Sequence, residues 1–176
     1  ALEQTQIINT RKLAQTIIFA ATTPTDKIFG DGAFDVFVSG GDSGLPVTLV
    51  ATPATVCTRS GITLTIVGPG DCLITASQAG NDNYKSSSAN KTVKIAQKKQ
   101  AITFDAPANK VFGDAPFTVT PTGGASGQPV TLSTSSPACE VTGNSVKIIG
   151  AGECVIAADQ EGNANYAAAI QEKKTL

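Results

Sequence analysis

The chain has 176 residues, a formal net charge of −1 and no His, Met or Trp, and it holds four Cys and 17 Gly. The absence of His excludes Ser–His catalytic triads and imidazole ligands for metals. No arginine-rich stretch points to nucleic acid, and no apolar run is long enough to insert into a membrane.

The first fourteen residues match neither copy of the internal repeat described below. Setting Gln15 against Gln100 places "QIIN" (Gln6–Asn9) over Lys91–Lys94, where the last strand of unit one is expected. We interpret residues 1–14 as an N-terminal segment that includes the last strand of a preceding repeat. The segment lacks the basic start and long apolar stretch of a signal peptide, which indicates a mature or excised fragment.

Two long stretches of the chain occur twice. Lys27–Leu49 matches Lys110–Leu132 at 14 of 23 positions, and Cys57–Tyr84 matches Cys139–Tyr166 at 13 of 28 positions. An internal repeat of this length indicates two structural units of one kind.

These matches set the expected domain boundaries. We place unit one at residues 15–96 and unit two at residues 97–176. The link Ala96–Gln100, "AQKKQ", is short and charged, and a short link limits relative motion, so we expect a semi-rigid rod.

Both units show the alternation of apolar and polar residues that marks half-buried strands. Turn-forming residues separate these runs, and no stretch keeps a helical period over three turns. About seven strands per unit, spaced at roughly 8 to 12 residues, are typical of a small antiparallel sandwich. The alternating runs are Phe34–Val38, Pro46–Thr52, Leu64–Gly68 and Cys72–Ser77 in unit one, and Phe117–Pro121, Pro129–Ser135, Ser145–Gly150 and Cys154–Asp159 in unit two.

The four Cys form one pair per unit. Structural zinc sites usually take Cys in close pairs such as C-x2-C, and redox dithiols take C-x-x-C at a helix start; neither pattern occurs here. One strand separates the two Cys of each pair, and such a chain path can bring them together. We therefore predict the disulfides Cys57–Cys72 and Cys139–Cys154, and an oxidising, extracellular setting.

Two further short motifs occur in both units. In "FGD" we expect the Gly to set a turn, and we expect the carboxylate of Asp31 or Asp114 to cap the amides of that turn. The alternative is that these carboxylates bind calcium. For Tyr84 and Tyr166, the only tyrosines, we expect a loop-closing role with the ring at the edge of the core and the hydroxyl on a backbone group. Stacking on a sugar is the alternative.

Two other patterns suggest chemistry at first sight. Lys27 and Lys110 precede "FGD", and such a Lys could form an isopeptide crosslink to Asn beside a buried acid. "GGDSG" (Gly40–Gly44) superficially looks like a serine-protease nucleophile loop, but the matching stretch reads "GGASG" and the chain has no His. We interpret the loop as a turn, and we assign no catalytic residue, no metal ligand and no cofactor.

The run from "FGDAPFTVT" through "SGQPVTL" to "GAGEC" and "GNANY" resembles the bacterial immunoglobulin-like repeats, of the MBG and related Big kinds, found in tandem in large surface and adhesin-type proteins. The resemblance covers roughly residues 15 to 170. It implies an all-β fold of two tandem immunoglobulin-like antiparallel β-sandwich modules, and it carries no catalytic residues.

Together these observations predict a structural function. We expect a non-catalytic spacer module of a bacterial cell-surface or secreted multi-repeat protein, part of an adhesin stalk, whose partners are neighbouring repeats of the same chain. One alternative is an adhesive module that contacts a host receptor or glycan through its loops. A second alternative is an accessory module of a secreted enzyme.

Overall fold

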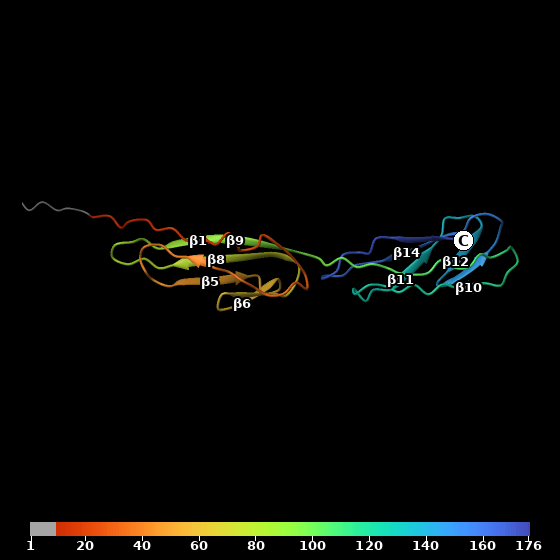
Figure 1. The fold of residues 1–176 in the computed structure, drawn as a ribbon, viewed down its shortest axis with the longest axis horizontal. Helices are drawn as coiled ribbons and strands as arrows, with labels where there is room; N and C mark the ends of the chain where they lie inside the picture. The colour runs from red at the N-terminus through yellow and green to blue at the C-terminus, as the bar shows by residue number, and fades with distance from the viewer. Residues whose placement is uncertain (1–9) are drawn as a thin grey trace, which may run out of the picture. The chain divides into compact units, whose positions relative to one another are not determined.

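The computed structural model describes residues 10–176, and within this range all regular secondary structure is strand (Figure 1). The chain divides into two compact units between Ala96 and Gln97. The interpretation of Gln6–Asn9 as the last strand of a preceding repeat lies outside the described residues. Each unit is described by itself.

Unit one is a sandwich of short strands whose inner faces share one core. A four-stranded sheet has the order β2-β9-β8-β5, a three-stranded sheet has the order β3-β7-β6, and β1 pairs with β4. The strands are β1 (Ile18–Phe19), β2 (Asp26–Ile28), β3 (Phe34–Asp35), β4 (Val38–Ser39), β5 (Val47–Thr52), β6 (Cys57–Ser60), β7 (Thr63–Ile66), β8 (Gly70–Gln78) and β9 (Ser87–Ala96).

The alternation in sequence sets which side chains of unit one reach this core. Along β8, Cys72, Ile74 and Ala76 are buried, because side chains two apart on a strand point to the same face. They pack with Leu49 from the same sheet and with Leu64 from the facing sheet. The core therefore lies between the two sheets.

Unit two repeats this plan with fewer strands. One sheet has the order β10-β13-β12 and the other β11-β14-β15. The strands are β10 (Phe117–Thr118), β11 (Val130–Ser133), β12 (Cys139–Thr142), β13 (Ser145–Ile148), β14 (Val155–Gln160) and β15 (Glu172–Thr175). Val119, Val146 and Ile156 are among the buried residues of its core. The predicted all-β, immunoglobulin-like sandwich fold is confirmed.

Two details of unit one differ from the expectation of seven antiparallel strands. The predicted run Phe34–Val38 is divided into β3 and β4, because β3 pairs with β7 whereas β4 pairs with β1. The pairing of β2 with β9 is parallel, with Asp26 opposite Lys94. After β1 the chain turns between Ala20 and Thr23, and it then joins the sheet that contains β9. This change of sheet lets β2 run in the same direction as the last strand.

Candidate functional site

The two predicted cystine bridges are present, one in each unit. Cys57 at the start of β6 is bonded to Cys72 in β8, with a Cα–Cα distance of 5.8 Å. Cys139 at the start of β12 is bonded to Cys154, which directly precedes β14, with a Cα–Cα distance of 5.7 Å. In both units the bridge joins the two facing sheets through the core.

Burial shields these bridges from solvent. Cys57 and Cys72 have no exposed surface, and Cys139 and Cys154 are 3% and 1% exposed. Thiol–disulfide exchange needs access of a thiolate to a sulfur atom. The bridges are therefore positioned as interior crosslinks, and the described residues contain no free cysteine.

The "FGD" motif forms the same turn in both units. The N–H of Ile28 donates to Oδ2 of Asp31 at 2.9 Å, and the N–H of Val111 donates to Oδ2 of Asp114 at 3.1 Å. Gly30, between them in unit one, has φ of 92°, a left-handed conformation that Gly adopts at low cost. Each Asp carboxylate thus holds the turn that the intervening Gly allows.

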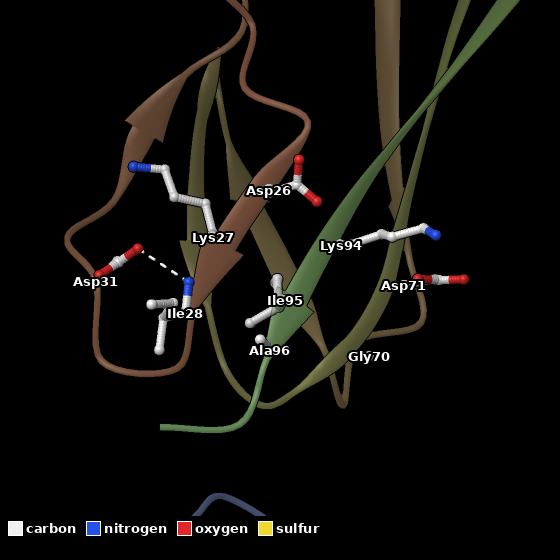
Figure 2. Close-up of a pocket in the computed structure, with 9 residues that line it drawn as sticks. All are labelled: Asp26, Lys27, Ile28, Asp31, Gly70, Asp71, Lys94, Ile95 and Ala96. Atoms are coloured by element: carbon white, nitrogen blue, oxygen red, sulfur yellow. Dashed lines mark hydrogen bonds between the residues drawn. The ribbon is translucent and has the colours of Figure 1, made fainter. Parts of the chain in front are cut away.

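This turn borders a surface pocket of about 610 Å³ in unit one. Figure 2 shows Ile28 and Ile95 between the ends of β2 and β9, with Asp31 directed back to the Ile28 backbone. Asp71 and Lys94 are opposite each other in the β8–β9 register, and both side chains extend away from Lys27. The pocket therefore has an apolar floor and a rim of both charges.

The described acids of unit one do not gather as a cation site. Oδ2 of Asp26 accepts from the hydroxyl of Thr25, and Oδ1 of Asp35 accepts from the hydroxyl of Thr63. Across residues 10–176, no group of three or more Cys, Asp or Glu side chains is arranged to hold a metal ion. The calcium alternative thus finds no set of ligands in the described part of the chain.

An amide network occupies the opposite end of unit one, and sequence reasoning missed it. Gln78 is 3% exposed; its Oε1 accepts from the N–H of Gly41 at 2.7 Å, and its Nε2 donates to the carbonyl of Leu45 at 2.6 Å. Oε1 of Gln15 accepts from the N–H of Ser43, and its Nε2 donates to the carbonyl of Lys85 at 2.7 Å. Two buried glutamines therefore hold the "GGDSG" loop in place.

Unit two holds the equivalent loop in the same way. Oε1 of Gln160 accepts from the N–H of Gly124 at 2.7 Å, and its Nε2 donates to the carbonyl of Gln128 at 2.7 Å. Oε1 of Gln100 accepts from the N–H of Ser126 at 2.8 Å. The recurrence of Gln at matching positions of the repeat was the sequence signal that could have revealed this network.

The paired glycines of the loop are required by close packing. A Cβ atom added to Gly41 would lie 2.6 Å from Cβ of Gln15, and one added to Gly124 would lie 2.6 Å from Cβ of Gln100. Because these neighbours are close to the backbone, they cannot rotate away. This explains "GG" in both copies without reference to the protease motif that it resembles.

The tyrosine loops are closed by asparagine and backbone groups. Oδ1 of Asn81 accepts from the N–H groups of Asn83 and Tyr84, and Tyr84 forms a parallel bridge with Leu13. In unit two, Asn163 and Tyr166 repeat this arrangement, with Lys98 in the place of Leu13. Both Tyr residues are half-buried. A closing role for their hydroxyls stays a prediction.

The lysines that precede "FGD" lie over aromatic rings. Lys27 Nζ is 5.5 Å from the centre of the Phe34 ring, and Lys110 Nζ is 5.4 Å from that of Phe117. A cation over the face of an aromatic ring is attracted by its electron density. This contact accounts for a Lys at the same position in both units.

Comparisons with known proteins give fold likeness at low sequence identity. No family model and no curated protein matches the chain. A crystal structure of Drosophila N-cadherin EC1-4 is 14% identical with a TM-score of 0.42; the match covers 93% of this chain and 48% of that one, so the chain spans about half of its length. The fibronectin(III)-like modules of Clostridium thermocellum CbhA are 12% identical with a TM-score of 0.32, covering 91% of this chain and 92% of theirs. Among residues 10–176, no helix has the length and apolar character needed to cross a membrane.

Proposed function

We propose that the chain is a non-catalytic spacer of an extracellular multi-repeat protein, part of an adhesin stalk on a bacterial surface. The observation that carries this proposal is the buried inter-sheet disulfide, which recurs at the same position in both units. It is supported by the amide network that holds the same loop in each unit. The repeated side chains of this protein thus serve to resist unfolding.

An extracellular location follows from the same bridges. Disulfides form and persist in oxidising compartments, and a spacer outside the cell meets shear and proteases. The crosslink limits how far a unit can be extended, because the residues between the two Cys remain closed in a loop even when the sheets separate.

Single-molecule stretching tests this function directly. Each bridge encloses a sequence separation of 15 residues, so reduction should lengthen the extension released per unit by about 50 Å at roughly 3.3–3.6 Å per residue. We expect oxidised units to unfold at higher force than the Cys57→Ala/Cys72→Ala variant. Equal unfolding forces for the oxidised and variant units would refute a mechanical role.

One observation favours the adhesive alternative. A groove of about 640 Å³ in unit one is lined in part by Ser86, Ser87 and Ser88, and the matching positions of unit two are Ala168, Ala169 and Ile170. The Ser hydroxyls of this groove can form hydrogen bonds with a polar ligand such as a glycan. The Ala and Ile side chains of unit two cannot, so binding would be specific to unit one. Saturable binding on a glycan array, lost when the three Ser are replaced by the unit-two residues, would support adhesion over a pure spacer.

A further inference from the structure

The outer face of the four-stranded sheet of unit one carries rows of short polar side chains. Strands β5, β8 and β9 lie side by side (Figure 1), and each row takes one exposed or half-buried residue from each strand. These side chains point away from the core, because the alternate residues along β8 are buried. The first row is Thr48, Ser77 and Ser88, and the second is Val50, Thr75 and Asn90.

A third row of Thr52, Leu73 and Thr92 completes this surface, and we call the three rows the neutral face. None of its residues is charged, and all but Val50 and Leu73 carry a hydroxyl or an amide. Within residues 10–176, only one of these polar side chains has a partner: the Thr48 hydroxyl donates to a backbone carbonyl at 3.2 Å. The other hydroxyls and the Asn90 amide can therefore exchange hydrogen bonds with a ligand.

A groove adjoins the first row. It has a volume of about 640 Å³, and its lining combines Thr48, Ser77 and Ser88 with Leu45 and Pro46. The groove thus places hydroxyls beside an apolar wall. The three rows continue it along the strands by about 13 Å, at roughly 3.3 Å per residue. A surface of this length is larger than one sugar ring and suits an oligomer.

Unit two has a different surface at the matching rows. There Asp159 lies opposite Thr131, and Lys173 lies opposite Ala157. The carboxylate of Asp159 is engaged, since both of its oxygens accept from Nε2 of Gln171, at 3.0 and 2.9 Å. Because the two units share one fold, the fold itself does not require the uncharged rows of unit one.

We propose that the neutral face and the adjoining groove bind an uncharged polysaccharide. Sugar rings carry hydroxyls at their edges and C–H groups on their faces. The free Ser, Thr and Asn groups can exchange hydrogen bonds with the hydroxyls, and Val50 and Leu73 can contact the C–H groups. The rows carry no cation, which a nucleic acid or an acidic polymer would require. They also lack the aromatic, Met and Arg side chains that protein interfaces favour.

The backbone prepares this face for binding. The three strands are joined by ladder hydrogen bonds, so the rows are already in place before a ligand arrives, and little ordering is needed on binding. The site rests on the adhesive alternative proposed above. The spacer role does not depend on it.

Affinity electrophoresis tests the proposal, in native gels that contain a mixed-linkage β-glucan, a mannan, a galactan or dextran. We expect at least one of these neutral polymers to retard the unmodified chain, and we expect hyaluronan and polygalacturonate, which are acidic, to leave its mobility unchanged. Ser77→Asp/Asn90→Lys introduces the unit-two residues at the same register positions and keeps the net charge. Its affinity should fall about tenfold or more, because the new charges lose hydration when a sugar covers them.

A matched control alters the outer face of the opposite sheet. Thr58 and Thr65 are exposed and pair with each other there, and the equivalent pair of unit two is Glu140 and Lys147. Thr58→Glu/Thr65→Lys therefore adds the same two kinds of charge and should bind like the unmodified chain. Thermal melts of both variants should match the parent, since unit two folds with these residues.

A second site variant tests the face without added charge. Thr75→Ala/Asn90→Ala removes two polar groups and should also weaken binding. Binding that persists in both site variants would overturn this site and place adhesion on another surface, and an equal loss in the control would overturn it as well. A chain that no neutral polymer retards would overturn both the site and the adhesive alternative, and would leave the spacer role intact.

Discussion

Removal of the bridge between Cys57 and Cys72 should destabilise unit one far more than an ordinary substitution. A crosslink over a separation of 15 residues contributes about 3 kcal/mol in the chain-entropy model. In a Cys57→Ala/Cys72→Ala variant, two fully buried sulfur atoms are also lost, each similar in size to a methylene group at about 0.8 kcal/mol. We therefore expect unit one to lose about 4–5 kcal/mol of unfolding free energy.

This loss is large relative to the stability of a small unit. Natural domains have roughly 0.05–0.15 kcal/mol per residue, which gives unit one, described over residues 10–96, about 4–13 kcal/mol. At about 4–8 °C per kcal/mol for a domain of this size, the midpoint should fall by roughly 16–40 °C. At the lower end of this stability range the variant unit would be close to unfolded, and at the upper end it would remain folded.

The two units can be followed separately in one chain. The protein has no Trp and two Tyr, one in each unit, so Tyr166→Phe leaves Tyr84 as the single fluorescent reporter of unit one. Urea titration in this background should show the loss in unit one, and the matched Cys139→Ala/Cys154→Ala variant should leave the Tyr84 transition in place. A loss below about 1 kcal/mol, or four free thiols in the denatured unreduced protein, would refute the reasoning.

Three further substitutions and one control substitution test the local contacts of unit one by urea unfolding. Gln78→Ala should cost about 2–4 kcal/mol, because it leaves the partly buried N–H of Gly41 and carbonyl of Leu45 without their side-chain partner; a cost under about 1 kcal/mol would show that water replaces the amide. Gly41→Ala should cost about 1–3 kcal/mol through its overlap with a glutamine side chain, whereas Gly32→Ala, which has nothing within 4 Å, should be neutral or slightly stabilising. Asp31→Ala should cost about 0.5–1.5 kcal/mol through loss of its bond to the Ile28 N–H, and an unchanged midpoint would show that Gly30 alone sets the turn.

Sequence reasoning was strongest where a signal is local or repeated. The alternation of apolar residues indicates strands because side chains two apart share a face, and Cys72, Ile74 and Ala76 follow this rule. The Asp and Gly of "FGD" lie within one turn, so the bond from Asp31 to a backbone amide could be anticipated from short-range chemistry. The pairing of Cys57 with Cys72 could be inferred because one strand separates them and each unit holds a single pair.

Contacts between distant segments were not accessible in this way. Gln15 and Gln78 are far apart in sequence, and only the folded sandwich brings both amides to the "GGDSG" loop. A polar residue such as Gln carries no periodic signal, so its burial cannot be read from a pattern of apolar residues. The parallel pairing of β2 with β9 was missed for a related reason, because it joins strands from opposite ends of unit one.

By itself, the sequence determined the strand content, the internal repeat, the turns and the two crosslinks, since each depends on neighbouring residues or on the matching copy. Only the tertiary structure decided which sheet each strand joins and which backbone groups the buried glutamines hold. These features depend on how the two sheets pack face to face. That packing results from many weak contacts, and no single stretch of sequence specifies them.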